Sequence, residues 1–215
     1  MSMLWSDPDR HEAEREADGF LRGVAVATVT DNRDPDGQSR IRVRFPWQPD
    51  EQSSFWARLT MPMTGDDMGT YFLPEIGDEV LVAFERGEQE HAFIIGALWN
   101  GAAPAPENNG DGENKTRLIR TRDKHELRFT DDPAAPEIDL KLADGKHLKL
   151  DRDGVVVEDA SGNMLTIESN SGAITIKSTG TLSLQSTQIS IEADASLSLS
   201  ASGEVSIQGA MVRIN

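Results

Sequence analysis

Short apolar pairs, separated by one polar residue, recur through the C-terminal third of this 215-residue chain. Alternation within a pair is typical of a strand with one buried face. The first residues of successive pairs lie on average eight positions apart, and Gly, Asp, Ser or Asn stand between the pairs, where the chain must turn. The pairs are Leu148/Leu150, Val155/Val157, Leu165/Ile167, Ile174/Ile176, Leu182/Leu184, Ile189/Ile191, Leu197/Leu199, Val205/Ile207 and Val212/Ile214.

This repeat favours an oligomer. A strand with two apolar residues on one face cannot enclose a dry core alone, and its edges are open to other chains. Three copies wound about a common axis would bury the pairs and match the edges, which predicts a trimeric β-prism about 40 Å long. A single-chain β-solenoid is the alternative. The predicted trimer core comprises Leu165, Ile167, Ile174, Ile176, Leu182, Leu184, Ile189, Ile191, Leu197, Leu199, Val205 and Ile207.

The preceding sequence predicts a small barrel. Residues 23–30, 40–45, 54–61, 79–85 and 91–98 read as strands, and Arg86–Gln89 reads as a hairpin turn. Within 40–45, Ile41, Val43 and Phe45 share one face, while three arginines occupy the other. Five strands without a convincing helix suggest an OB-fold.

The chain therefore divides into four predicted segments. Residues 1–19 form an N-terminal extension with a short polar helix over 7–18, and residues 20–100 form the OB-fold domain. Residues 101–116, rich in Gly, Pro and Asn, are a linker, and residues 117–215 form the needle. The predicted fold class is all-β.

Composition narrows the functional classes. Thirty-seven acidic and twenty-one basic residues give a formal net charge of −16, which disfavours nucleic-acid partners. There is no cysteine, and we predict no signal peptide, so synthesis in the cytoplasm is expected. The aromatic residues of the barrel could stack on bases or sugars, but core and interface packing is favoured.

No catalytic or metal-binding pattern emerges. His11, His91, His125 and His147 are dispersed, and no nucleophile elbow or zincin motif is present. Adjacent carboxylates such as Asp131 and Asp132 read as turn residues in so acidic a chain. We therefore expect a non-enzymatic protein without a cofactor.

Four stretches resemble the spike proteins of contractile injection systems, namely VgrG-type spikes and phage baseplate assembly protein V. They are the strand through Arg40–Trp47 after an Asp-Pro-Asp-Gly loop, the segments Phe72–Phe84 and Ile94–Asn100, and the segment Leu118–Asp132. The final Val-x-Ile pairs resemble the blunt end of the needle in such spikes. Full-length VgrG chains carry large hub domains before the OB domain. Only about twenty residues stand there in this chain, so the resemblance to baseplate assembly protein V is closer.

The resemblance implies a homotrimeric central spike in a phage tail, an extracellular injection particle or a type VI-like system. Its OB domain would sit on a baseplate hub protein, and its needle would pierce the target cell envelope. It would be assembled in bacterial or archaeal cytoplasm and then become part of a virion or injection particle. A PAAR-repeat tip protein would bind the blunt end, at Gln208, Met211, Val212, Arg213, Ile214 and Asn215. The alternative function is a monomeric OB-fold module with a β-solenoid tail that binds oligosaccharide or single-stranded nucleic acid.

Overall fold

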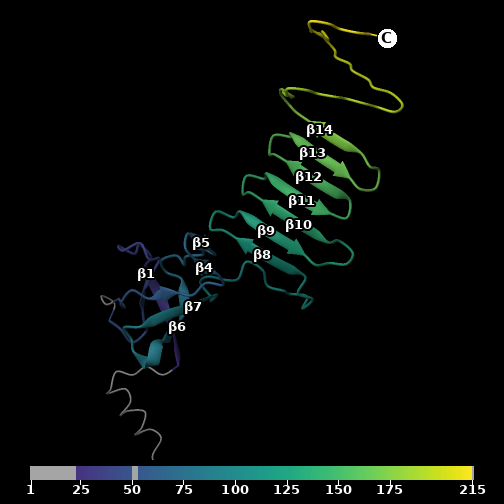
Figure 1. The fold of residues 1–215 in the computed structure, drawn as a ribbon. Helices are drawn as coiled ribbons and strands as arrows, with labels where there is room; N and C mark the ends of the chain where they lie inside the picture. Colours follow the sequence, from purple (N-terminus) through teal and green to yellow (C-terminus); the bar gives the residue numbers. More distant parts are fainter. Residues whose placement is uncertain (1–22, 50–52, 215) are drawn as a thin grey trace, which may run out of the picture. The chain divides into compact units, whose positions relative to one another are not determined.

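The structure is a computed structural model that describes residues 23–49 and 53–214. These residues form two compact units, the first ending at Gly112 and the second beginning at Glu113 (Figure 1). Both are built from strands, so the chain is all-β, as the sequence predicts. The helix predicted over residues 7–18 lies outside the described residues.

The first unit contains a five-stranded sheet in the order β2-β1-β6-β7-β3. The two end strands are linked by Ile41 and Ala57, whose backbones exchange hydrogen bonds of 2.8 and 2.9 Å. This bridge closes the sheet into a barrel, and closure leaves no open edge along the ring of strands. The strands are β1 (Val24–Asp31), β2 (Arg42–Arg44), β3 (Arg58–Leu59), β6 (Glu79–Phe84) and β7 (Ala92–Leu98).

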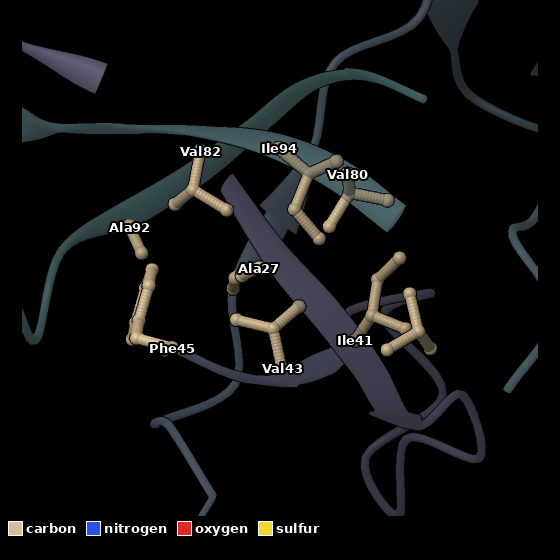
Figure 2. Packing of buried hydrophobic residues seen from close by; sticks show 10 residues of the cluster. Ala27, Ile41, Val43, Phe45, Val80, Val82, Ala92 and Ile94 are labelled. Carbon is tan, nitrogen blue, oxygen red and sulfur yellow. The ribbon is translucent and has the colours of Figure 1, made fainter. Parts of the chain in front are cut away.

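The barrel core follows the alternation read from the sequence. Ile41, Val43 and Phe45 are at most 1% exposed, and they pack with Val80, Ile94 and the other residues of one apolar cluster (Figure 2). Ten buried apolar side chains make a small core, and the Phe45 ring extends it outward by stacking on Trp47 with ring centroids 4.8 Å apart. The intervening arginines, Arg42 and Arg44, lie outside the core.

A hairpin between β3 and β6 was not predicted from the sequence. Its strands, β4 (Thr64–Gly65) and β5 (Met68–Gly69), contain two residues each, so no alternating pattern can appear in them. The turn places Asp67 at φ 52°, in the left-handed region that Asp adopts more readily than most residues. The predicted hairpin between β6 and β7 is present, and the 3-10 turn η1 (Glu85–Gly87) begins its connection.

The second unit is one seven-stranded sheet in which each strand pairs antiparallel with its sequence neighbour (Figure 1). Tight turns connect most of the strands, and Asp-Gly occurs at two of them, as predicted. The strands are β8 (Thr116–Arg120), β9 (Glu126–Thr130), β10 (Glu137–Lys141), β11 (His147–Asp151), β12 (Gly154–Glu158), β13 (Met164–Glu168) and β14 (Ile174–Lys177).

Residues 178–214 follow β14 without an assigned strand. Five of the predicted apolar pairs fall in this stretch, so in a single chain they do not form the strands that their alternation suggested. The physical reason is the absence of a partner, because a strand needs a neighbour for its N–H and C=O groups. The alternation is present in residues 178–214, but no neighbouring segment of the described chain pairs with it.

Candidate functional site

One face of the second sheet carries two continuous rows of apolar side chains. The strand registers align seven residues in the first row, one from each strand: Ile119, Leu127, Leu140, Leu148, Val157, Leu165 and Ile176. The second row begins with Arg117 on β8 and continues with Phe129, Ile138, Leu150, Val155, Ile167 and Ile174. We call these thirteen apolar residues the apolar face.

The apolar face is uncovered within the chain. On β10, Ile138 and Leu140 are 41% and 49% exposed, whereas the alternate residues Glu137 and Asp139 are half-buried among polar neighbours. At the end of the sheet the exposed fraction of Ile174 reaches 68%. Monomeric proteins seldom expose so long a contiguous apolar surface, which marks this face as an interaction site.

The opposite face of the sheet is mainly polar, and several of its charged groups pair with one another, although Asp139 Oδ1 is buried without a hydrogen-bond partner. Glu126 accepts hydrogen bonds from the guanidinium groups of Arg120 and Arg128, both at 2.6 Å. Partial burial raises the pKa of Glu126, but the two arginines outweigh this effect and lower the pKa overall. Lys149 likewise donates to Asp151 at 2.8 Å. This face therefore suits contact with water.

Four aspartates close turns of the second sheet, and we call them the turn aspartates. At Asp159, the carboxylate accepts from the Asn163 side chain at 2.6 Å and from the backbone N–H of Ser161 at 2.7 Å. These hydrogen bonds stabilise the ionised form and lower the pKa of Asp159. The pKa values of the other three are lowered by comparable bonds from turn N–H groups and lysines. The turn aspartates are Asp132, Asp144, Asp151 and Asp159.

The predicted trimer-core residues fall into two sets. Four of them, Leu165, Ile167, Ile174 and Ile176, lie on the apolar face in β13 and β14. The other eight lie in residues 178–214, outside any strand, and their exposed fractions range from 53% for Ile189 to 70% for Leu199. The eight are Leu182, Leu184, Ile189, Ile191, Leu197, Leu199, Val205 and Ile207.

The sequence prediction left out the earlier half of the apolar face. The nine residues from Ile119 to Val157 were not among the predicted core, although Ile138 and Leu140 alternate plainly. Four of the nine, Leu148, Leu150, Val155 and Val157, were identified as apolar pairs of the repeat but not placed in the predicted core. The other five precede the repeat, where the intervals between strands are irregular. The pairing of β8 with β9 and β10 supplies the missing information.

The predicted tip residues lie at the end of the described chain. Met211, Val212 and Ile214 are 72%, 49% and 90% exposed, and the Arg213 Nε lies 3.3 Å from the Met211 sulfur. Asn215 lies outside the described residues. An apolar, exposed terminus of this kind can receive a partner, but nothing in the single chain identifies it.

Residues 23–49 and 53–214 contain no group of three or more His, Asp or Glu side chains arranged to hold a metal ion. Over the same residues, no helix is long and apolar enough to cross a membrane. His91 contacts Glu88, the His125 ring accepts a hydrogen bond from the backbone of Ala143, and His147 Nδ1 lies 3.3 Å from the Gly145 carbonyl oxygen. The three histidines among the described residues therefore all have local partners.

Comparison with known proteins agrees with this architecture. Residues 25–99 match the family model of the Type VI secretion system/phage-baseplate injector OB domain, which is the barrel of the first unit. The chain is 28% identical over 156 residues to the Type VI secretion system spike protein VgrG3 of Vibrio cholerae, covering 68% of this chain and 15% of that protein. It is 26% identical over 156 residues to the spike protein VgrG1a of Pseudomonas aeruginosa, covering 66% of this chain and 23% of that protein.

A third relative is the actin cross-linking toxin VgrG1 of Vibrio cholerae, 28% identical over 164 residues, with 68% of this chain and 14% of that protein covered. The chain thus spans less than a quarter of the length of each of these curated relatives. The barrel of the first unit thus matches the model of the Type VI secretion system/phage-baseplate injector OB domain, and the chain is similar to VgrG-type spike proteins.

Proposed function

We propose that this chain is the central spike of a contractile injection apparatus and acts as a homotrimer whose second unit forms the needle. The observation that carries the proposal is the apolar face, whose thirteen side chains form two rows across the seven strands and are uncovered in one chain. Three such narrow faces directed at a common axis would bury one another along the whole sheet. The similarity to spike proteins supports the same reading.

A face-to-face dimer would also cover the apolar face, so the number of chains needs a separate argument. Residues 178–214 provide it, because they contain five more apolar pairs but no strand. A stacked dimer of the folded sheets would leave these residues without neighbours for their backbone groups. Three intertwined copies supply each segment with a strand on both sides and extend the apolar axis to the terminus.

Strength against axial force follows from this architecture. The backbone groups in the needle would be paired, within one chain up to Lys177 and between chains beyond it. The charged residues lie mainly on the polar face, and residues 178–214 contain only Glu192, Asp194, Glu204 and Arg213 as charged groups. We expect a needle whose axis excludes water and carries few charged groups to resist bending and shear. A spike that pierces a cell envelope needs this resistance.

The remaining parts of the proposal concern partners and location. The injector OB domain would contact a baseplate hub protein, and the exposed apolar terminus at Met211 and Ile214 would receive a PAAR-repeat tip. The spike would be assembled in the cytoplasm and then become part of the particle. Its role would be structural rather than catalytic, and the toxin activity in one relative's name is ascribed to that protein alone.

The proposal can be tested on injection particles purified from cells that produce an epitope-tagged chain. We expect the tagged chain to copurify with sheath and tube proteins in a ratio of three copies per particle end. A variant with Ile214→Asp should assemble into particles with the same ratio but should lose the tip protein. Absence of the tagged chain from sheath-containing particles would refute the spike function.

A further inference from the structure

A shallow hollow of about 540 Å³ lies beside the first row of the apolar face. It extends over four neighbouring strands, β10 to β13. Its apolar lining consists of Leu142 and of four first-row residues, Leu140, Leu148, Val157 and Leu165. The ends of these strands and the turns that join them contribute the rest of the lining. Its open surface is almost wholly apolar, so it suits an apolar occupant.

Leu142 widens the hollow beyond the strands. It lies just after β10 and continues the alternation of Ile138 and Leu140. Its N–H donates to the Lys146 carbonyl at 2.8 Å, and its own carbonyl accepts from the Gly145 N–H at 3.0 Å. The turn therefore fixes the Leu142 backbone, and the Leu142 side chain is 40% exposed.

The two sides of the apolar face are unlike. Beyond the first row lies the hollow with Leu142. Beyond the second row, the same alternation leads to Asp131 after β9, Pro136 before β10 and Arg152 after β11. Unlike sides suit a head-to-tail contact, in which one side of each copy meets the other side of the next copy.

The occupant of the hollow must be apolar and must repeat along the sheet. The first-row lining comes from one side chain per strand, and neighbouring strands lie about 4.8 Å apart. The second row of an identical sheet has the same spacing, and its Ile138 and Leu150 are 41% and 39% exposed. Three copies around a common axis would bring the second row of each copy beside the first row of the next.

We propose that the hollow receives the second row of a second copy, and that Leu142 of one chain packs against Phe129, Ile138 or Leu150 of the next. Each copy then offers its second row to one neighbour and its hollow to the other. This inference rests on the proposed trimer and names the surfaces through which the copies touch.

The chain has no cysteine, so engineered cysteines report this contact without background. Leu142→Cys is combined with one second cysteine in the second row. The second substitution is Phe129→Cys, Ile138→Cys or Leu150→Cys, because the tilt of the strands relative to the needle axis decides which position is level with Leu142. These three positions lie side by side on β9, β10 and β11.

A disulfide between the two positions must join two chains. Within one chain, Leu142 and Ile138 are four residues apart, which is about 13 Å along an extended backbone. Phe129 and Leu150 lie opposite Ile138 on the neighbouring strands, so they are no closer to Leu142. A disulfide needs Cα atoms within about 7 Å of each other.

After oxidation, at least one of the three double variants should run as a covalent trimer on a denaturing gel without reductant. Each single variant should run at the mass of one chain. The matched control is Glu137→Cys with Lys141→Cys, which has the same four-residue spacing on β10 but lies on the opposite face of the sheet. This control should also run at the mass of one chain.

Two results would overturn the proposal. Covalent dimers from Leu142→Cys alone would place one hollow against another. Absence of a covalent trimer from all three double variants, although their reduced forms are trimers by light scattering, would show that the second row does not meet the hollow.

If the reduced double variants are not trimers, the single variants are co-expressed with different tags. A disulfide-linked pair that carries both tags supports the contact, and its absence counts against it. The mass of the unmodified chain is measured first, and a monomer at this stage would refute the proposed trimer and this inference together. A trimer without the expected cross-links would refute the inference alone.

Discussion

Truncation of Ile176 to alanine tests the apolar face at its most exposed end. Ile176 is 58% exposed in the single chain, so somewhat more than half of its side-chain surface remains to be buried on assembly. Full burial of an isoleucine side chain stabilises the buried state by about 1.5–3 kcal/mol, and an alanine side chain retains only part of this stabilisation. Assembly should therefore lose roughly 1 kcal/mol per copy, or about 3 kcal/mol per trimer, by the same relation.

A loss of about 3 kcal/mol raises the dissociation constant of the trimer by about two orders of magnitude. Sedimentation of the protein across a urea series would measure it as a lower midpoint for trimer dissociation. The matched control is Thr175→Ala, one residue earlier on the polar face of the same strand. If both variants dissociate at the same urea concentration as the parent, the apolar face is not the trimer interface.

Three further predictions concern the folded units. The turn aspartates have lowered pKa values in the folded sheet, so their stabilisation is complete above the unfolded pKa of about 3.9 and is lost as pH falls below it. The urea concentration at the unfolding midpoint of the second unit should then be constant from neutral pH to about pH 5 and should decrease at pH values under about 4. A decrease of this midpoint already above about pH 5 would contradict the prediction. Gly154→Ala should destabilise the sheet by about 3 kcal/mol or more because the added Cβ would lie 1.8 Å from the Ile167 carbonyl oxygen. The control Gly101→Ala, where a Cβ would meet nothing within 4 Å, should leave the melting temperature unchanged. Asp34→Asn should lower the melting temperature of the barrel, because the Asp34 carboxylate accepts two hydrogen bonds of 2.8 Å from the Arg40 guanidinium. An unchanged barrel transition in calorimetry would show that this loop contact does not stabilise the barrel.

The barrel could be predicted well from the sequence because its strands alternate cleanly. Ile41, Val43 and Phe45 were placed on one face by pattern alone, and all three are buried. The β4–β5 hairpin could not be predicted, because strands of two residues carry no period. The hairpin instead depends on Gly65 and Gly69, because a Cβ at either position would collide with Met68 or with the Met63 carbonyl oxygen. These close contacts are known only once the structure places the methionines beside the glycines.

The second unit shows where a sequence pattern and a single chain diverge. The apolar pairs up to Ile176 lie in strands because neighbouring segments of the same chain supply the hydrogen bonds. The pairs from Leu182 onward have the same alternation but no such neighbour. The alternation of apolar and polar residues therefore predicts which side chains need burial, but it does not identify the segment or chain that buries them.

The solution mass of the purified chain, measured by light scattering, tests the central claim most directly. One chain has a mass of 23.5 kDa, so the account predicts three times this value, 70.5 kDa, for the particle in solution. The species should keep this mass in moderate urea, because in the proposed trimer the folding of residues 178–214 would be coupled to assembly. A mass of 23.5 kDa at micromolar concentration would contradict the trimer and leave the apolar face without the partner proposed for it.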